Sequence, residues 1–325
     1  MELVCPAGTP SALRTAVDAG ADAVYCGFRD ATNARNFPGL NFDLPELREG
    51  VVYAHARGTK VLVAINTFAR AGNTELWRDA VRKAVSAGAD ALILADIGLL
   101  GWARRNFAEQ RLHLSVQAAA SNAKAIAFYV ERYGIKRVVL PRVLTVEEIG
   151  AITADISCET EVFAFGGLCV MTEGRCQLSS YATGMSPNMN GVCSPAEKVE
   201  YRQQGSELSA RLGGFTIDRY PAGKPAAYPT LCKGRFEVGN GSGHIFEEPT
   251  SLNVLALLPA LKAAGVSALK IEGRQRGKAY LSAVVSQFRT ALDALDAGQP
   301  LPKSALAAVS EGGRETTGAY KKTWR

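Results

Sequence analysis

Short runs of apolar residues recur along the chain, and most of them follow an amphipathic segment that ends in glycine. Examples are DAGADAVYCGF around Gly20 and SAGADALILAD around Gly88. The same junction occurs near three further glycines, Gly58, Gly134 and Gly265. Because glycine suits the left-handed position just beyond a helix, each junction predicts a helix end followed by a strand. The apolar runs are continuous rather than alternating, which is typical of a parallel sheet covered by helices.

Three more apolar runs fit the same series without the glycine: ELVCPAG at 2–8, LHLSVQAAA at 112–120 and TEVFAFGG at 160–167. Eight strands that alternate with helices over about 250 residues predict an α/β fold, a (β/α)8 TIM-like barrel. A doubly wound open sheet produces the same local pattern and is the alternative. However, no G-x-G-x-x-G follows the first strand. We therefore expect residues 1–325 to form a single barrel domain.

The regular alternation breaks between the seventh strand, which ends near Gly167, and the eighth, which begins near Ser267. About a hundred residues lie there, with turn-forming stretches such as GMSPNMNG, RYPAGKPAAYP and GNGSGH. We expect an inserted segment, residues 166–250, at the mouth of the barrel, where TIM barrels keep their active sites. A phosphate-binding loop joins a strand to a helix. GNGSGH does not lie in that setting, so a hairpin turn is expected instead.

Composition and charge narrow the functional classes. The chain is 47% hydrophobic, and its net charge of +6 is spread along the sequence without a basic block. Neither a nucleic-acid partner nor a membrane surface is indicated. The N-terminal residues lack a leader-like pattern, and no uncharged apolar run is long enough to span a membrane. We expect a soluble, cytoplasmic protein. In such a reducing compartment, the seven cysteines indicate metal binding or burial rather than disulfides.

The cysteines fall into two groups. Three lie in or beside apolar strands, where a thiol acts as a small hydrophobic group: Cys5, Cys26 and Cys158. The other four lie in the insertion among Gly, Arg, Ser, Pro and Lys: Cys169, Cys176, Cys193 and Cys232. Four thiolates can hold a zinc ion or a cubane iron–sulfur cluster. Structural zinc usually uses tight C-x2-C pairs, whereas the spacing here is C-x6-C-x16-C-x38-C. This spacing favours the iron–sulfur cluster and leaves zinc as the alternative.

Polar residues at the carboxyl ends of the strands are candidates for an active site at the mouth. They are Asn66, Gln117, Asn122, Arg142, Glu272 and Arg274. The amide side chains could equally cap helices or satisfy loop backbone. The two arginines are suited to a carboxylate, because a guanidinium binds oxygens in pairs, or to compensation of the thiolates. The loop NARNFPGLNF could form a lid whose Phe37 and Phe42 cover an apolar ligand, or it could be a packed Ω-loop.

Several longer stretches together resemble the collagenase-like peptidase family, and most closely its branch in ubiquinone biosynthesis. They include DAVYCGFRDATNARNFPGLNF, SVQAAASN, FAFGGLCVMTEGRCQLSSY, YPTLCKGRF, EEPTSLN and KIEGRQRG. The resemblance implies a [4Fe–4S] cluster on Cys169, Cys176, Cys193 and Cys232. It also implies O2-independent hydroxylation of the aromatic ring of a prenylated ubiquinone precursor, carried out as a heterodimer with a homologous subunit. Prephenate is the oxygen donor that the resemblance suggests.

Two other functions remain open. A peptidase needs a nucleophile with a base, or a metal-activated water, and neither H-E-x-x-H nor G-x-S-x-G occurs. A thiol protease that uses Cys26 as its nucleophile with His113 as its base is the remaining form of a peptidase. Alternatively, the metal could only stabilise the inserted segment, and the barrel could serve as a non-catalytic binding or scaffold partner. For the heterodimer we expect an apolar contact that includes the insertion or the tail, where Tyr320 and Trp324 would be exposed aromatics. The alternative is that the tail packs back on the surface of its own barrel.

Overall fold

A computed structural model describes residues 1–190, 192–224 and 226–321. Eight parallel strands form a closed barrel, because the last of them pairs with both the first and the seventh. In barrel order they are β1 (Glu2–Pro6), β2 (Ala23–Cys26), β3 (Lys60–Ile65), β4 (Ala91–Leu94), β5 (Arg111–Leu114), β6 (Arg137–Val139), β7 (Glu159–Gly167) and β14 (Ala268–Ile271). The predicted (β/α)8 fold is confirmed, and the open doubly wound sheet is excluded.

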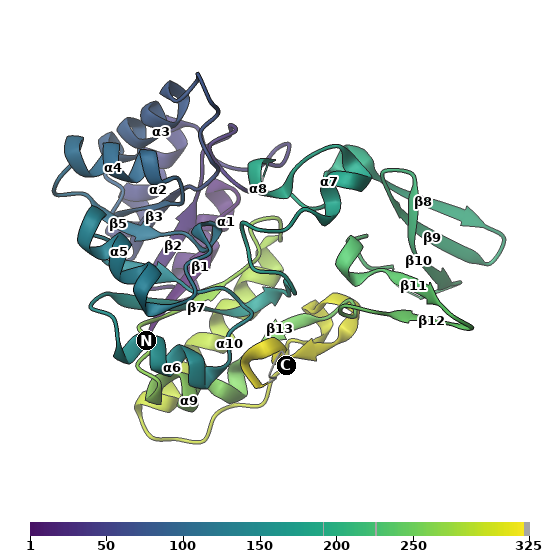
Figure 1. Ribbon diagram of the computed structural model, residues 1–325. Coiled ribbons are helices and arrows are strands. Elements are labelled where there is room, and N and C mark those ends of the chain that lie inside the picture. The colour runs from purple at the N-terminus through teal and green to yellow at the C-terminus, as the bar shows by residue number, and fades with distance from the viewer. Residues whose placement is uncertain (191, 225, 322–325) are drawn as a thin grey trace.

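Helices surround the barrel (Figure 1). They are α1 (Pro10–Asp18), α2 (Leu44–His55), α3 (Glu75–Ser86), α4 (Ile97–Asn106), α5 (Ala123–Tyr133), α6 (Val146–Ala154), α9 (Leu258–Ala263) and α10 (Lys278–Asp296). Side-chain caps begin α1, α2, α4, α5 and α6, and two of these caps are the reciprocal Asp43–Glu46 and Thr145–Glu148 pairs. The five glycines predicted to stop helices have φ between 68° and 98°. None of the described helices combines the length and apolar character that a membrane crossing requires.

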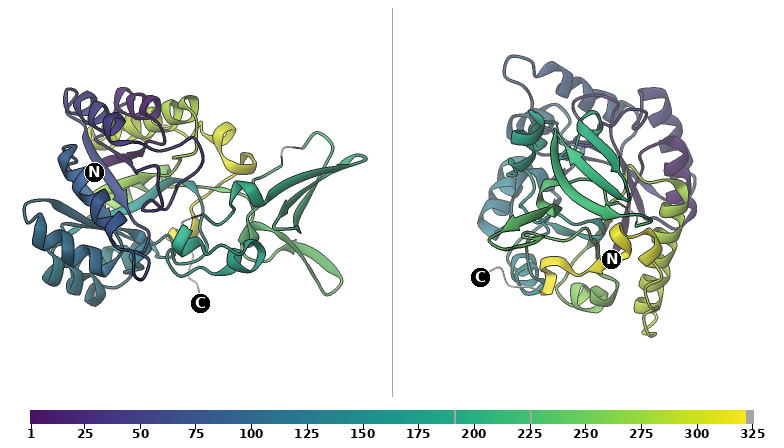
Figure 2. Two further views of the ribbon diagram at one scale, coloured as in Figure 1. Left: turned by 90° about the horizontal axis from the view of Figure 1, so that it is seen from above. Right: turned by 90° about the vertical axis from the view of Figure 1, so that its right-hand side faces the viewer.

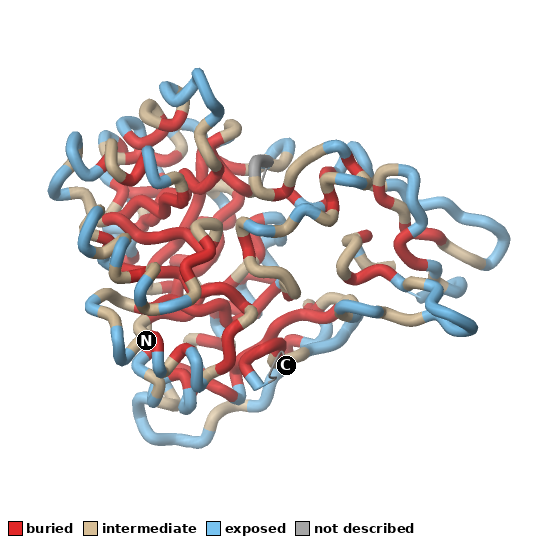
Figure 3. The backbone as a smooth tube through the Cα atoms, in the orientation of Figure 1, coloured by how far each residue is buried: buried red, intermediate tan, exposed pale blue. Residues whose placement is uncertain are grey.

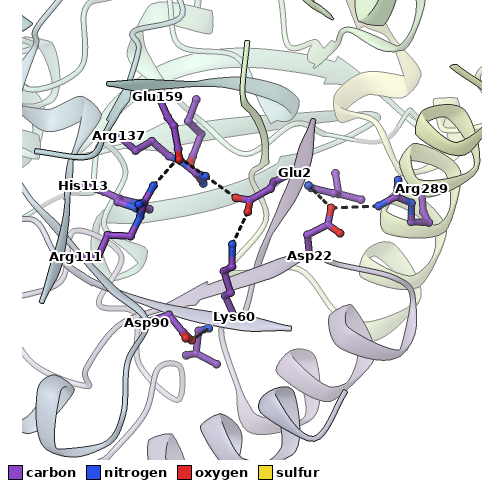
Figure 4. Close-up of polar contacts among 12 residues, drawn as sticks. Glu2, Asp22, Lys60, Asp90, Arg111, His113, Arg137, Glu159 and Arg289 are labelled. Atoms are coloured by element: carbon purple, nitrogen blue, oxygen red, sulfur yellow. Dashed lines mark hydrogen bonds and ion pairs between the residues drawn. The ribbon is translucent and has the colours of Figure 1, made fainter. Parts of the chain in front are cut away.

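The barrel interior is apolar in the middle and charged at its floor. Small and medium apolar side chains fill the middle: Val4, Ala23, Tyr25, Leu62, Ala64, Ala91, Ile93 and Ala268. At the amino ends of the strands, the buried Arg137 pairs with Glu2 at 2.5 Å, Glu159 at 2.6 Å and Glu161 at 3.3 Å, and Lys60 pairs with Glu2 at 2.6 Å (Figure 4). These ion pairs close the end of the barrel opposite to the mouth.

The segment between β7 and β13 (Ser251–Asn253) leaves the barrel as a separate lobe (Figures 1 and 2). It contains α7 (Leu178–Thr183), α8 (Pro187–Asn190), the antiparallel strands β8 (Val199–Gln204), β9 (Glu207–Leu212) and β10 (Phe215–Pro221), and the hairpin β11 (Arg235–Val238) with β12 (Gly241–His244). GNGSGH therefore lies in a hairpin, as predicted. Buried backbone dominates the barrel, whereas the tip of the lobe is exposed (Figure 3).

The chain returns to the barrel through β13, which pairs with the end of β7, and β15 (Glu315–Thr316) pairs with β13. Short 3-10 helices complete the fold: η1 (Val116–Ala118), η2 (Ala196–Lys198), η3 (Leu231–Lys233), η4 (Leu255–Leu257), η5 (Ala307–Val309), η6 (Glu311–Gly313) and η7 (Gly318–Lys321). The expectation of an exposed Tyr320 is wrong. Its side chain is buried, and its hydroxyl donates to the carbonyl of Phe163 at 2.7 Å. Trp324 lies outside the described residues.

Candidate functional site

A cavity of about 160 Å³ opens at the carboxyl end of the barrel. Five of the residues predicted from sequence line it: Asn66, Gln117, Arg142, Glu272 and Arg274. Asn122 instead caps α5, because its side chain accepts a hydrogen bond from the backbone N–H of Ala125 at 2.9 Å. The structure thus gathers residues that lie up to about two hundred positions apart in the chain into one pocket wall, as TIM-barrel geometry requires.

Arg142 is held by carboxylates on two sides. It pairs with Glu173 from the loop after β7 and with Glu272 after β14, and its guanidinium lies 3.4 Å from the ring centroid of Phe163. Arg35 adds a second cation to Glu272 at 3.2 Å. Burial alone would lower the pKa of Arg142, but the two carboxylates outweigh it and the pKa is raised. Sequence reasoning missed Glu173 and Arg35, although both are charged residues in glycine- or asparagine-rich loops.

Arg274 has no such compensation. Its Nη1 donates to Asn33 Oδ1 at 2.6 Å, and none of the described carboxylates forms an ion pair with it. Burial is the main reason that its pKa is lowered to about 10. Gly8 lets the loop approach closely, because a Cβ there would lie 1.8 Å from the carbonyl oxygen of Arg274. A buried guanidinium without a carboxylate, in a cavity wall, is suited to an anionic ligand.

Three polar atoms in the pocket wall lack a hydrogen-bond partner among the described residues although they are buried: Gln117 Oε1, Arg142 Nε and Glu173 Oε2. Buried polar atoms are rarely left in this state without a ligand or water. Asn66 differs, because its Oδ1 accepts from Ala34 N at 3.0 Å and its Nδ2 donates to Ser115 Oγ at 3.3 Å. Asn66 therefore holds the loop after β2 in place.

Lys270 lies at the base of the cavity and was missed from the sequence. Its Nζ pairs with Glu161 Oε1 at 2.7 Å and lies 3.8 Å from the ring centroid of Tyr25. Burial is the main cause of its lowered pKa. The sequence contained a signal for this pair, because Lys270 interrupts the apolar run ALKI and Glu161 interrupts TEVF.

The four insertion cysteines come from different segments but influence one another electrostatically. Burial is the main cause that raises the pKa of Cys232 to about 12, and Cys193 and Cys176 raise it further. Cys169 is likewise influenced by Cys232. Cys193 is exposed as a residue, but its thiol is surrounded by protein atoms. This burial raises the pKa of the Cys193 thiol, and the charge of Arg35 partly lowers that pKa. Two of these thiols also interact with the cavity wall, Cys169 with Arg142 and Glu173, and Cys193 with Arg35 and Glu272.

Within the described part of the chain, no group of three or more His, Cys, Asp or Glu side chains is arranged so that it could hold a metal ion. Zinc needs its ligands gathered closely around one point. Among the described residues, the four thiols are therefore not gathered into a closed metal-binding group.

The proposed thiol-protease pair is not assembled. Burial raises the pKa of Cys26 to about 12, and burial together with Arg137 and Arg111 holds the pKa of His113 well below its ordinary value. His113 Nε2 accepts from Arg111 Nε at 2.9 Å, at the charged floor shown in Figure 4. No hydrogen bond or ion pair joins these two described residues, so a thiolate and its base are both missing.

Residues 8–319 match the family model described as Peptidase family U32. The chain belongs to Peptidase family U32. It is 34% identical to tRNA hydroxylation protein P of Escherichia coli (strain K12), over 94% of this chain and 70% of that protein. It is 29% identical to a 23S rRNA 5-hydroxycytidine synthase of the same organism, over 91% of this chain and 40% of that one. A collagenase of Porphyromonas gingivalis (strain ATCC BAA-308 / W83) is 27% identical, over 90% of this chain and 66% of that protein. The relatives of this chain thus include proteins named for hydroxylation and others named for proteolysis.

Proposed function

We propose that the chain is a UbiU-like iron–sulfur subunit of an O2-independent hydroxylase that acts on the aromatic ring of a prenylated ubiquinone precursor. The observation that carries this proposal is the interaction of two of the four thiols, Cys169 and Cys193, with charged residues of the cavity wall. Cys169 interacts with Arg142, and Cys193 interacts with Arg35, so the cysteine segment and the barrel mouth form one electrostatic unit. A site of this kind suits redox chemistry at a bound aromatic ring better than peptide hydrolysis.

The donor set fits a [4Fe–4S] cluster. Cys169, Cys176, Cys193 and Cys232 would hold it, and four thiolates are its usual ligands. Arg142, Arg35 and Lys233 each stabilise the negative form of at least one of these thiols. The wide spacing of the four cysteines along the chain counts against zinc. When bound, the cluster would supply one-electron redox capacity beside the cavity.

The cavity residues then bind and orient an acidic oxygen donor such as prephenate. Arg274 is the one to bind its carboxylate, because that guanidinium is buried in the wall without a carboxylate partner. Each charge-assisted hydrogen bond would contribute about 1.5 to 3 kcal/mol. Arg142 and Glu272 hold the shape of the wall, and Gln117 Oε1 is an unused acceptor for a donor hydroxyl.

A homologous, UbiV-like subunit would complete the enzyme as a heterodimer. Seven of the ten large hydrophobic side chains that are exposed among the described residues lie on the lobe: Tyr181, Tyr201, Phe215, Tyr228, Val238, Ile245 and Phe246. Apolar surface concentrated in this way marks an interaction site. The partner contact is therefore proposed on the lobe and not on the tail, since Tyr320 is buried against the barrel. It is proposed at the five of these side chains that line neither pocket: Tyr201, Tyr228, Val238, Ile245 and Phe246.

RNA hydroxylation is the second candidate, because U32 relatives at 34% and 29% identity are named for tRNA and rRNA hydroxylation. The third candidate is a non-catalytic scaffold protein whose inserted segment is stabilised by a metal. The charged cavity, with its polar atoms that lack hydrogen-bond partners among the described residues, is evidence against it. Peptidase activity is the weakest, since Cys26 and His113 do not form a reactive pair.

The discriminating experiment is a deletion of the gene in cells that must make ubiquinone anaerobically. We expect ubiquinone to be lost, to return with the wild-type chain, and to stay absent with Cys176→Ala. Hydroxylated nucleosides in tRNA and rRNA are measured in the same cells and should be unchanged. Normal ubiquinone with a loss of hydroxylated RNA would replace this proposal by the second candidate.

A further inference from the structure

We propose that a separate apolar pocket in the lobe binds the isoprenoid tail of the aromatic substrate. This inference rests on the proposed function and names a second binding site for the same substrate, outside the barrel. The pocket has a volume of about 280 Å³ and lies between α7, β10 and β11. Its walls include Leu178, Tyr181, Phe215, Ile217, Leu231 and Phe236.

The chemistry of the walls selects a hydrocarbon. The charged side chain that lines the pocket, Arg235, is already engaged, because its Nε donates to Asp218 Oδ1 at 3.2 Å. A nucleobase or a peptide would need several hydrogen-bond partners, and a phosphate would need a free cation. An isoprenoid chain needs neither, because burial of apolar surface alone stabilises it. The volume lies just below the range of about 300 to 1,000 Å³ of typical ligand pockets, so it suits part of a tail.

The position of the pocket links it to the proposed cluster. Leu178 lies two residues after Cys176, and Leu231 directly precedes Cys232, so two walls continue the segments that carry proposed ligands. None of the pocket residues lines the barrel cavity. A tail held here would anchor its ring beside the cysteine segment. The barrel cavity would then bind the acidic donor, and the lobe pocket would bind the apolar tail.

The exposure of the rim also agrees with a ligand that covers it. Tyr181 is 88% exposed and Phe215 is 61% exposed. Both are large aromatic side chains at the edge of a concave surface, and such side chains lose solvent contact when a ligand enters.

The test measures binding of phenols that carry zero, one, two or three isoprene units to the full chain, purified without oxygen and with its iron retained. We expect the dissociation constant to fall at least tenfold for each of the first two units, since a buried methylene contributes about fourfold in affinity. Phe215→Glu should abolish this dependence on tail length. Val52→Glu on α2 is the matched control, because Val52 is 69% exposed, lies outside the lobe and does not line the pocket.

A second variant, Ala182→Phe, fills the pocket from α7 and should have the same effect as Phe215→Glu. Affinity independent of tail length in the wild type, or equal loss in Phe215→Glu and Val52→Glu, would overturn the tail site. So would displacement of the tailed phenol by tRNA. Because ubiquinone synthesis in deleted cells is measured separately, a failed tail site leaves the proposed function standing. Normal ubiquinone after deletion would reject the function itself.

Discussion

Arg142 and Arg274 line one cavity but are neutralised differently. Arg142 lies between Glu173 and Glu272, whereas Arg274 relies on the amide oxygen of Asn33. The sequence pointed to both arginines because each follows an apolar strand run. It could not distinguish them, since Glu173 is 31 positions from Arg142 and Asn33 is 241 positions from Arg274. We therefore expect Arg274 to be dispensable for folding and Arg142 to be needed for it.

We expect Arg142→Gln to lower the free energy of unfolding by about 3 to 5 kcal/mol, because it leaves two carboxylates without their buried cation. Arg274→Lys should change stability little and still abolish anaerobic ubiquinone synthesis, since lysine keeps the charge but loses the paired hydrogen bonds. Denaturant midpoints and cellular ubiquinone, measured together, check both. Normal ubiquinone in Arg274→Lys would remove this residue from donor binding.

The starts of the barrel strands form a charged floor that the sequence did not reveal. The strand positions themselves were predictable, because glycine stops and continuous apolar runs are local signals. Lys270, Glu161 and Arg137 interrupt those runs, but their pairing depends on barrel closure, which places β6, β7 and β14 side by side. Whether a charged residue in a strand meets its partner is decided by the register between strands.

This floor should make stability depend on pH. Burial would raise the pKa of Glu2, but Lys60 and Arg137 outweigh it and the pKa lies below its ordinary value of 4.5. The stabilising contribution of Glu2 is therefore complete above about pH 4.5 and is lost as the pH falls through the lower folded value. Glu2→Gln should cost about 1 kcal/mol at pH 7, a small figure because Glu2 is partly solvated. The difference from wild type should shrink toward pH 3 in urea unfolding, and a constant difference would contradict this reading.

The loop that carries Cys169 and Cys176 is fastened to η1 by a close backbone contact. Gly174 has a φ of 79°, and a Cβ there would lie 2.0 Å from the carbonyl oxygen of Gln117. Gly184 has a similar φ of 73° with open space around it. Both alanine variants bear the left-handed strain of about 1 kcal/mol, but only Gly174→Ala must displace the loop. We expect iron to be lost from Gly174→Ala and retained in Gly184→Ala, and equal iron contents would show that this contact is not needed.

At the scale of the whole molecule, the barrel provides a charged cavity that opens at its mouth, and the lobe provides apolar surface. The sequence predicted both parts, through its repeats and its turn-rich insertion, but placed the tail wrongly. Tyr320 was expected at the surface as part of an apolar contact with the partner subunit. It is buried because its hydroxyl satisfies the carbonyl of Phe163, a contact across 157 positions.

The lobe is expected to bind the homologous subunit. Phe246→Asp should prevent a heterodimer from forming, because a carboxylate in an apolar contact is costly to desolvate. Phe128→Asp on α5 is the control, since Phe128 is 49% exposed and Phe246 is 45% exposed. Sedimentation of the co-expressed subunits measures the assembly. A heterodimer that survives Phe246→Asp and dissociates in Phe128→Asp would move the interface to the helical side of the barrel.

The iron and sulfide content of anaerobically purified protein tests the central claim most directly. The account predicts about four iron and four sulfide per chain in the wild type. It predicts an almost complete loss in the alanine variants of Cys169, Cys176, Cys193 and Cys232. Cys158→Ala, which changes a cysteine of intermediate exposure outside the lobe, should keep full content. Full iron in Cys176→Ala, or zinc in place of iron in the wild type, would contradict the account.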